Sequence, residues 1–284
     1  METFNTRIPR ELAVQYGEQA VQIMRQGVYR APSGRNVTIA DLVERSTQGT
    51  ISYPPEIPLP DAHIGDYQTQ IEVANETTLA AVQRLHQSGH HPVALNFASA
   101  THPGGGFLSG ALAQEEYLAR SSGLYACLVQ NPMYAFHRAR HDPLYSDYVI
   151  YSPEVPVFRA DDGTLLETPY TVGMITSPAV NAGALHPGRQ AEIQPAMWSR
   201  ILKVLSAGVL HRHDSIVLGA WGCGAFGNDS SEIAQLFQRA LEENFKGAYR
   251  QVIFAILDWS SGKRFIGPFQ RIFASDDDQA YGRR

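Results

Sequence analysis

Five short runs of consecutive apolar residues constrain the fold more than any other feature of this sequence. They span 92–98, 147–151, 172–176, 215–220 and 252–257. A strand that is apolar at successive positions must be covered on both faces, which is typical of the central strands of α/β proteins. The runs therefore predict a mostly parallel or mixed sheet that lies between layers of helices.

Helical periodicity separates these runs along the chain. Apolar residues recur at helical spacing in 10–26, 72–87, 115–130, 194–210 and 231–244. Asp229 and Ser230 can cap the last of these helices. In an open sheet of this kind, ligands bind beyond the carboxyl ends of the strands, where loops lead into helix N-termini with unpaired N–H groups.

Composition excludes several classes of protein. The 284 residues carry 23 Lys and Arg against 28 Asp and Glu, and this net charge of −5 gives no basic surplus for direct nucleic-acid binding. A hydrophobic fraction of 44% excludes a disordered chain. No stretch reaches the roughly 20 apolar residues that span a bilayer, and residues 1–17 lack the apolar centre of a signal peptide. We expect a cytoplasmic protein without a membrane partner, and a solvated end over 275–284.

No metal site or cofactor is predicted. Cys127 and Cys223 belong to no cluster with zinc spacing, so both are expected to be free thiols. The histidines at 90–91, 186 and 211–213 form no metalloprotease motif, and solvated or hydrogen-bonded histidines are the favoured interpretation.

The first glycine-rich junction follows the run 92–98. Gly104, Gly105 and Gly106 stand seven residues before Gln114, Glu115 and Glu116, which begin a helix. Three successive glycines suggest backbone with positive φ or a close approach by a ligand such as a phosphate, although a mobile turn has the same composition. Two acidic residues in a first turn also complement the helix dipole. Adjacent helical residues point about 100° apart, so if both carboxylates act, they act in different roles.

The second glycine-rich junction follows the run 215–220. Gly222, Gly224 and Gly227 satisfy G-x-G-x-x-G, but the match is late in the chain, and Asp258 lies 31 residues after the last glycine (258 − 227) rather than about 20. Neither loop continues into the Lys-Ser or Lys-Thr of a Walker motif. Two such loops can instead hold one diphosphate through backbone N–H groups.

Taken together, these residues resemble the bacterial-type poly(ADP-ribose) glycohydrolases. The resemblance rests on the triple glycine with its Gln-Glu-Glu at 114–116 and on Gly-Cys-Gly-Ala-Phe at 222–226, with supporting similarity at 26–29, 151–158 and 177–181. It implies a three-layer α/β/α, macrodomain-like mixed sheet with an N-terminal helical extension. The whole chain, 1–284, would be one domain and a monomer, with an extension over about 1–90 packed on a macrodomain core over about 91–274.

The same resemblance implies a hydrolase that cuts the ribose–ribose O-glycosidic bond of poly(ADP-ribose), mainly from chain ends, and releases ADP-ribose. Glu116 would be the general acid and base, and Glu115 would hold hydroxyls of the terminal ribose. Poly(ADP-ribosyl)ated proteins would be the substrates, within a DNA-damage response. The implied substrate-binding residues are Ser99, where the animal enzymes have Asn, Gly104, Gly105, Gly106, Gln114, Gly222, Cys223, Gly224, Ala225 and Phe226.

Three other functions use the same loops. A non-catalytic ADP-ribose-binding macrodomain would need the glycines but not Glu116. A mono-ADP-ribosyl hydrolase would bind the same ligand. An NAD-dependent oxidoreductase is more remote, because the G-x-G-x-x-G match comes late in the chain.

Overall fold

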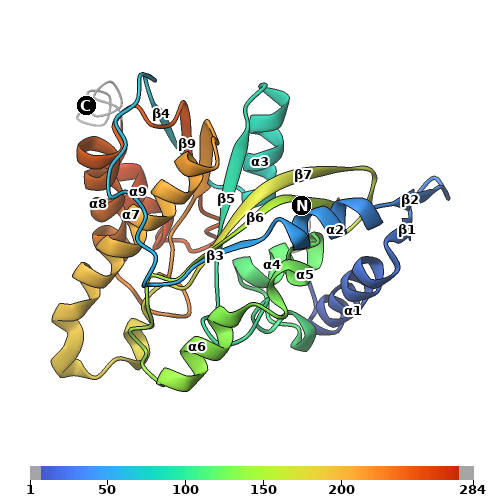
Figure 1. The fold of residues 1–284 in the computed structure, drawn as a ribbon, viewed down its shortest axis with the longest axis horizontal. Helices are drawn as coiled ribbons and strands as arrows, with labels where there is room; N and C mark the ends of the chain where they lie inside the picture. Colours follow the sequence, from blue (N-terminus) through green and yellow to red (C-terminus); the bar gives the residue numbers. More distant parts are fainter. Residues whose placement is uncertain (1–7, 275–284) are drawn as a thin grey trace. The chain divides into compact units, whose positions relative to one another are not determined.

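The computed structural model of this chain describes residues 8–274. They form two compact units with interleaved sequences: unit 1 takes 8–58 and 93–178, and unit 2 takes 59–92 and 179–274. Both units combine strands with helices, so the predicted α/β class is confirmed (Figure 1). Over 8–274, every helix is too short or too polar to cross a bilayer. The end predicted to be solvated, 275–284, lies outside the described residues.

Unit 1 contains a mixed group of strands. Their order is β3 (Ile51–Tyr53), β6 (Val149–Arg159), β7 (Leu165–Ser177) and β5 (Pro92–Phe97). β6 pairs antiparallel with β3 and β7, whereas β5 runs parallel to β7, with Leu95 opposite Ile175. β5 is buried along almost its whole length, so cover on both faces explains why its residues are apolar at successive positions apart from Asn96.

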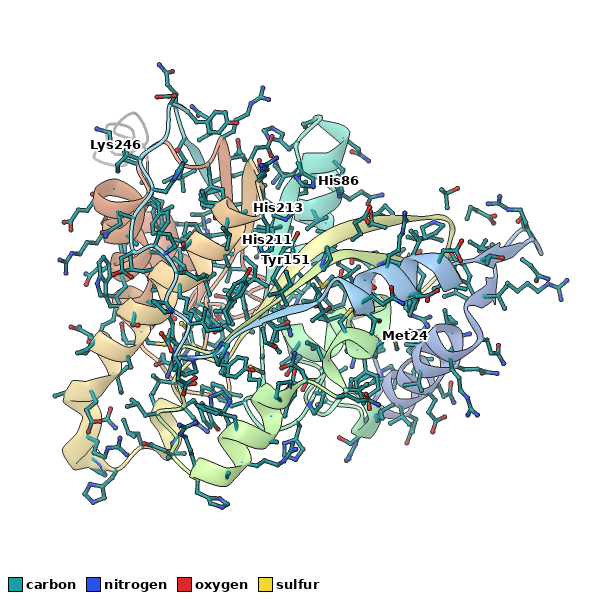
Figure 2. The ribbon with its side chains drawn as sticks, in the orientation of Figure 1. Met24, His86, Tyr151, His211, His213 and Lys246 are labelled. Carbon is teal, nitrogen blue, oxygen red and sulfur yellow. The ribbon has the colours of Figure 1, made fainter. Side chains whose placement is uncertain are left out.

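The helices of unit 1 cover these strands and form a second small core. They are α1 (Arg10–Gln26), α2 (Ala40–Gln48), α4 (Gln114–Ser121), α5 (Leu124–Leu128) and α6 (Pro132–Arg140), with a hairpin of β1 (Val28–Arg30) and β2 (Asn36–Thr38). α2, α4 and α5 pack on β6, and α1 packs on α4. Ala20 and Ile23 of α1 are buried with Tyr29 and Phe158, and Met24 packs at the edge of this core (Figure 2).

Unit 2 contains parallel strands in the order β8 (Ser215–Leu218), β9 (Gln251–Ala255) and β4 (Gln70–Ala74). Its helices are α3 (Thr78–Gln87), α7 (Ile193–Leu210), α8 (Ser230–Arg239) and α9 (Ile266–Ile272). α3 packs on β8 and β9, α9 packs on β4, and α8 packs on both α7 and α9 (Figure 1). Asp229 caps α8 by accepting hydrogen bonds from the N–H groups of Ser231 and Glu232, which confirms the predicted cap.

Two predicted helices are wrong in part. The stretch 72–87 begins as β4, in which every residue is at least partly exposed, and becomes helix only after Thr77 caps α3. The stretch 115–130 is two helices, because Ser122 adopts an extended conformation and forms a bridge with Val157 of β6. The hydroxyl of Ser122 donates to the carbonyl of Leu118, which satisfies the end of α4.

Candidate active site

The first glycine loop, residues 99–113, joins the carboxyl end of β5 to α4 in unit 1. Gly104 and Gly105 have φ of +69° and +60°, in the left-handed region that favours glycine. A Cβ atom on Gly105 would lie 2.2 Å from Oε1 of Glu116 and 2.9 Å from Oε2 of Glu115. Only glycine therefore lets the loop pass this closely along both carboxylates.

Glu116, in the first turn of α4, is 8% exposed. Its Oε1 accepts a 2.8 Å hydrogen bond from the N–H of Gly106. Its Oε2 is buried and contacts no hydrogen-bond donor among the described residues. A buried carboxylate oxygen without a donor destabilises the ligand-free protein, which is typical of groups that act on a ligand.

Glu115 is also buried, but both of its oxygens have partners. Oε2 accepts a 2.6 Å hydrogen bond from the N–H of Ser99, and Oε1 accepts a longer one, 3.4 Å, from Nδ2 of Asn96. Burial raises the pKa of Glu115 well above its ordinary value, and the neighbouring charge of Glu116 adds to that rise. Desolvation thus outweighs the helix N-terminus, which acts in the opposite direction.

Gln114 fixes the start of α4 against β5. Its Oε1 accepts from the N–H of Phe97 at 2.9 Å, and its Nε2 donates to the carbonyl of Leu95 at 2.8 Å. The side chain of Ser99 is used inside the loop, where Oγ accepts from the N–H groups of Thr101 and His102. Both predicted residues thereby shape the surroundings of the carboxylates.

The amides of the first loop are largely used within the protein. Gly105 donates to the carbonyl of His102 at 3.0 Å, and Gly106 donates to Glu116. The glycines therefore hold the carboxylates in place more than they offer unpaired N–H groups.

The second glycine loop, residues 219–229, follows β8 in unit 2. Gly222 has φ of +76°, and a Cβ atom there would lie 2.5 Å from the Cβ of Ala179. The side chain of Asn228 donates from Nδ2 to the carbonyls of Val180 and Gly222, at 2.7 and 3.0 Å. Asn228 therefore fastens the loop to the segment after β7, a role that no motif in the sequence indicated.

The tip of this loop is open. Gly224 and Ala225 are exposed, and their N–H groups have no acceptor among residues 8–274, whereas Phe226 is half-buried. Cys223 is buried, and burial raises the pKa of its thiol to about 12, so this thiol is not a nucleophile near neutral pH. Both cysteines are free, as predicted.

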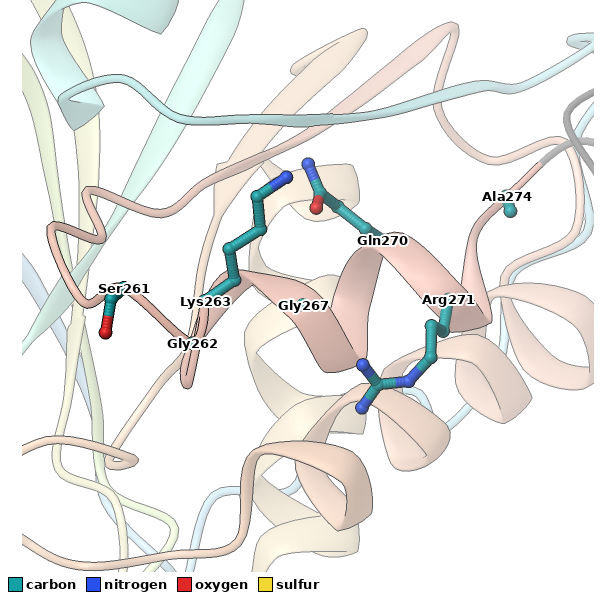
Figure 3. A pocket seen from close by; sticks show the side chains of 7 residues that line it. All are labelled: Ser261, Gly262, Lys263, Gly267, Gln270, Arg271 and Ala274. Atoms are coloured by element: carbon teal, nitrogen blue, oxygen red, sulfur yellow. The ribbon is translucent and has the colours of Figure 1, made fainter. Parts of the chain in front are cut away.

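An open depression at α9 contains none of the predicted residues. Its volume is about 550 Å³, and it is lined by Ser261, Gly262, Lys263, Gly267, Gln270, Arg271 and Ala274 (Figure 3). Within the described part of the chain, no group of three His, Cys, Asp or Glu side chains is placed to hold a metal ion.

Comparison with known proteins gives consistent matches. Residues 17–160 match the family model "Microbial-type PARG, catalytic domain". No curated protein matches this chain. The crystal structure of poly(ADP-ribose) glycohydrolase from Thermomonospora curvata is 49% identical, with a TM-score of 0.88 over 93% of this chain and 100% of that one.

Two structures with bound molecules are also similar. The Thermomonospora curvata enzyme bound to the inhibitor ADP-HPD is 47% identical, with a TM-score of 0.85 over 93% of this chain and 100% of that one. The Deinococcus radiodurans enzyme in complex with ADP-ribose is 41% identical, with a TM-score of 0.77 over 83% of this chain and 98% of that one.

Proposed function

We propose, since this chain belongs to the microbial-type poly(ADP-ribose) glycohydrolase (PARG) family, that it hydrolyses the ribose–ribose O-glycosidic bond of poly(ADP-ribose) and releases ADP-ribose. We assign the general acid to Glu116 because of the way in which its carboxylate is held. One of its oxygens is fixed by the N–H of Gly106, and the other is buried without a donor among the described residues. A carboxylate held in this way can exchange a proton with a ligand without first giving up a bond at that oxygen.

The chemistry requires two proton transfers, and one carboxyl group can perform both in turn. Protonated Glu116 gives its proton to the ribose 2′-oxygen as the bond between that oxygen and the anomeric carbon breaks, leaving positive charge on the sugar ring. The carboxylate then takes a proton from a water molecule whose oxygen bonds to the anomeric carbon. The product is ADP-ribose, and Glu116 is protonated again for the next cycle.

Glu115 has a different task in this proposal. Its carboxylate accepts hydrogen bonds from hydroxyls of the terminal ribose, supported by the N–H of Ser99 and by Asn96. Gly104, Gly105 and Gly106 allow the ribose to approach both carboxylates, since a side chain at Gly105 would collide with them. Gln114 keeps the first turn of α4, and with it both carboxylates, in a fixed position beside β5.

Residues of the second loop bind the same ligand in this proposal. The exposed N–H groups of Gly224 and Ala225 are suited to the oxygens of a diphosphate, because nothing in the described chain accepts from them. Gly222 and Cys223 form the base of the loop, and Phe226 contacts the terminal ribose. The Deinococcus radiodurans structure with ADP-ribose supports this class of ligand.

The finer parts of the function are proposals of the same kind. We propose that the enzyme acts mainly from chain ends, as a monomer without a direct nucleic-acid partner. We also propose that the protein is cytoplasmic and that its substrates are poly(ADP-ribosyl)ated proteins that arise in the response to DNA damage. Product sizes from polymer of defined length test the first of these, since cleavage from ends gives ADP-ribose without oligomers.

Replacing Glu116 by Gln tests the central assignment. Release of ADP-ribose from purified poly(ADP-ribose) should fall by about 10²–10⁴-fold, the usual contribution of a general acid and base. Binding of ADP-ribose, measured by calorimetry, should persist. Glu232→Gln is the matched control, because Glu232 occupies the same position in the first turn of α8, is exposed and should leave the rate unchanged.

The outcomes separate the competing functions. Unchanged release by Glu116→Gln would overturn the role assigned to Glu116. If the natural protein bound ADP-ribose but released none, it would be a non-catalytic ADP-ribose-binding protein. Release from mono-ADP-ribosylated protein in place of polymer, identified by product mass, would make it a mono-ADP-ribosyl hydrolase.

A further inference from the structure

Gly17 stands near the centre of α1, where glycine is a poor residue for a helix. It is buried, and alanine at such a position would stabilise the helix relative to glycine. A Cβ atom on Gly17 would lie 2.9 Å from the carbonyl oxygen of Phe107 and 3.3 Å from Cδ2 of its ring. The glycine therefore allows α1 to approach the backbone of the first glycine loop closely.

Phe107 is the residue of that loop on which the contact depends. It follows the three glycines directly and is 1% exposed. Its ring centroid lies 4.8 Å from that of Tyr125 in α5, and a Cβ atom on Gly104 would lie 3.0 Å from Cδ1 of Phe107. The ring is thus enclosed by α1, α5 and the loop's own backbone. A side chain packed on all of these sides fixes the backbone from which it extends.

A second contact joins α1 to the same loop. Gly110 has φ of +81°, and a Cβ atom there would lie 2.6 Å from Cγ of Arg10 and 2.8 Å from its carbonyl oxygen. Nε of Arg10 donates to the carbonyl of Ser109 at 2.9 Å. From α4, Nη1 of Arg120 donates to the carbonyl of Ala111 at 2.6 Å. This part of the loop is therefore held by both helices, which pack on each other.

The held segment begins directly after the residue that fixes Glu116. Gly106 donates its N–H to Oε1 of Glu116 at 2.8 Å. The carbonyl of Gly106 accepts from the N–H groups of Ser109 and Ala111, at 3.0 and 3.1 Å. Because one tight turn joins these residues, a displacement at Phe107 moves Gly106 with it. The position of the Glu116 carboxylate thus depends on where α1 holds the loop.

We propose that Gly17 and Phe107 are positioning residues for Glu116, through which α1 holds the carboxylate in its reactive place. This inference rests on the proposed function. The close approach at Gly17 sets the position of Phe107, and the N–H of Gly106 passes that position on to the carboxylate. A displacement of about 1 Å in a reacting group can lower a rate by about 10²-fold, so a small shift of the loop is sufficient.

Gly17→Ala tests the proposal, because its methyl group would collide with the Phe107 carbonyl while favouring the helix itself. We expect kcat for release of ADP-ribose to fall by about tenfold to a hundredfold. The dissociation constant of ADP-ribose, measured by calorimetry, should change by less than about threefold, since we assign the diphosphate to the second glycine loop. A purely structural role would reduce the amount of folded protein without lowering kcat per folded molecule.

Gly267→Ala is the matched control for the added methyl group. Gly267 lies in α9 of unit 2, and a Cβ atom there would lie 3.4 Å from its nearest neighbours, which is ordinary contact. This variant should keep the kcat of the natural protein.

Arg10→Gln is a milder test of the same α1 contact. It removes the donor to the carbonyl of Ser109, so kcat should fall by about twofold to tenfold, as expected for one hydrogen bond. Arg25→Gln is its matched control, because it removes the same charge from an exposed position in the last turn of α1. It should leave kcat unchanged.

The outcomes separate this inference from the proposed function. Unchanged kcat in Gly17→Ala would overturn the inference, as would a loss of affinity as large as the loss of kcat. If Gly17→Ala does not fold, the arginine variants decide, and equal kcat in Arg10→Gln and Arg25→Gln overturns the inference. If Glu116→Gln abolishes release while the α1 variants behave as the natural protein, the inference alone fails. If Glu116→Gln is fully active, the proposed function fails by itself.

Discussion

Gly105 is the residue at which backbone conformation determines most directly where the carboxylates lie. Its φ of +60° and its contact with both Glu115 and Glu116 leave no room for a side chain. The three glycines predicted either positive φ or a close approach by a ligand, and the positive φ is confirmed at Gly104 and Gly105. The neighbour is the protein's own pair of carboxylates, and the amides are used internally, which a motif of three glycines does not reveal.

Gly105→Ala should therefore abolish most activity for a steric reason. A methyl group would displace Glu116, and we expect kcat to fall by about 10²-fold or more. The free energy of unfolding should fall by about 1–2 kcal/mol from the strained φ. Gly89→Ala is the matched control, because Gly89 has φ of +78° and no atom within 4 Å of the added Cβ. It should lose similar stability and keep full activity, and equal activity losses in the two variants would contradict the steric explanation.

Some residues of the site could not be predicted from the sequence. Asn96 lies inside an apolar run, and Asn228 stands among residues that are typical of turns. Their importance comes from which atoms they meet, with partners as far away as Thr176 for Asn96 and Val180 for Asn228. Local pattern carries no information about such long-range polar contacts, whereas the spacing of Gln114, Glu115 and Glu116 after the glycines is itself local.

At the scale of whole elements, prediction succeeded where one signal dominated. The helices α1 and α7 follow their predicted ranges closely, because helical periodicity continues without a competing pattern. The stretch that became β4 alternates apolar and polar residues at Ile71, Glu72 and Val73, a period-2 pattern that the longer helical window hid. The short strand β3 and the helices α2 and α6 were missed, since short elements are fixed by packing more than by periodicity.

The second glycine loop is an element in which one side chain, Asn228, adds to the backbone hydrogen bonds that hold it. Asn228→Ala should lower the free energy of unfolding by about 1–3 kcal/mol, because the carbonyl of Val180 loses its side-chain donor and that of Gly222 keeps only the backbone N–H of residue 228. The loosened loop should also weaken ADP-ribose binding by about tenfold with little change in kcat, as measured by calorimetry and initial rates.

Asp229→Ala is the comparison for this prediction. It removes the cap of α8, which is worth about 1 kcal/mol, but leaves the side-chain hydrogen bonds of Asn228 intact. Affinity should therefore stay near that of the natural protein. Equal losses of affinity in the two variants would show that general stability, and not the Asn228 contacts, controls binding.

At the scale of the whole molecule, a group of histidines in unit 2 affects stability in acid. His211 and His213 lie between α7 and β8 (Figure 2), and the ring of His213 stacks on that of His91 with centroids 4.3 Å apart. Nδ1 of His213 lies 3.2 Å from the carbonyl oxygen of His91. Burial, followed by the nearby His91, lowers the pKa of His213 to about 4.

This shift predicts loss of stability in acid. Below pH 6.5 the unfolded chain binds a proton at residue 213 that the folded chain binds only near pH 4, so the free energy of unfolding should fall by about 3 kcal/mol across that window. His213→Phe keeps an aromatic ring against His91 but cannot titrate. The free energy of unfolding, measured with urea at several pH values between 4 and 7, should change less with pH in the variant than in the natural protein. An equal dependence on pH in the two proteins would contradict the assignment to His213.

The interleaving of the two units also lies beyond local pattern. Residues 59–92 belong with 179–274 because β4 pairs with β9 about 180 residues later. The apolar runs identify the α/β class, but the partner of each strand is decided by packing between distant segments.

The two hydrogen bonds of Gln114 have a mechanical consequence. Because its amide is tied at both ends to the backbone of β5, the first turn of α4 is anchored to a buried strand. The glycine segment is anchored in turn to α4, since the N–H of Gly106 donates to Glu116 and the guanidinium of Arg120 donates to the carbonyl of Ala111. Strand, helix turn and loop are thereby joined in series, so a substitution that cuts the Gln114 contacts should displace both carboxylates and their loop together.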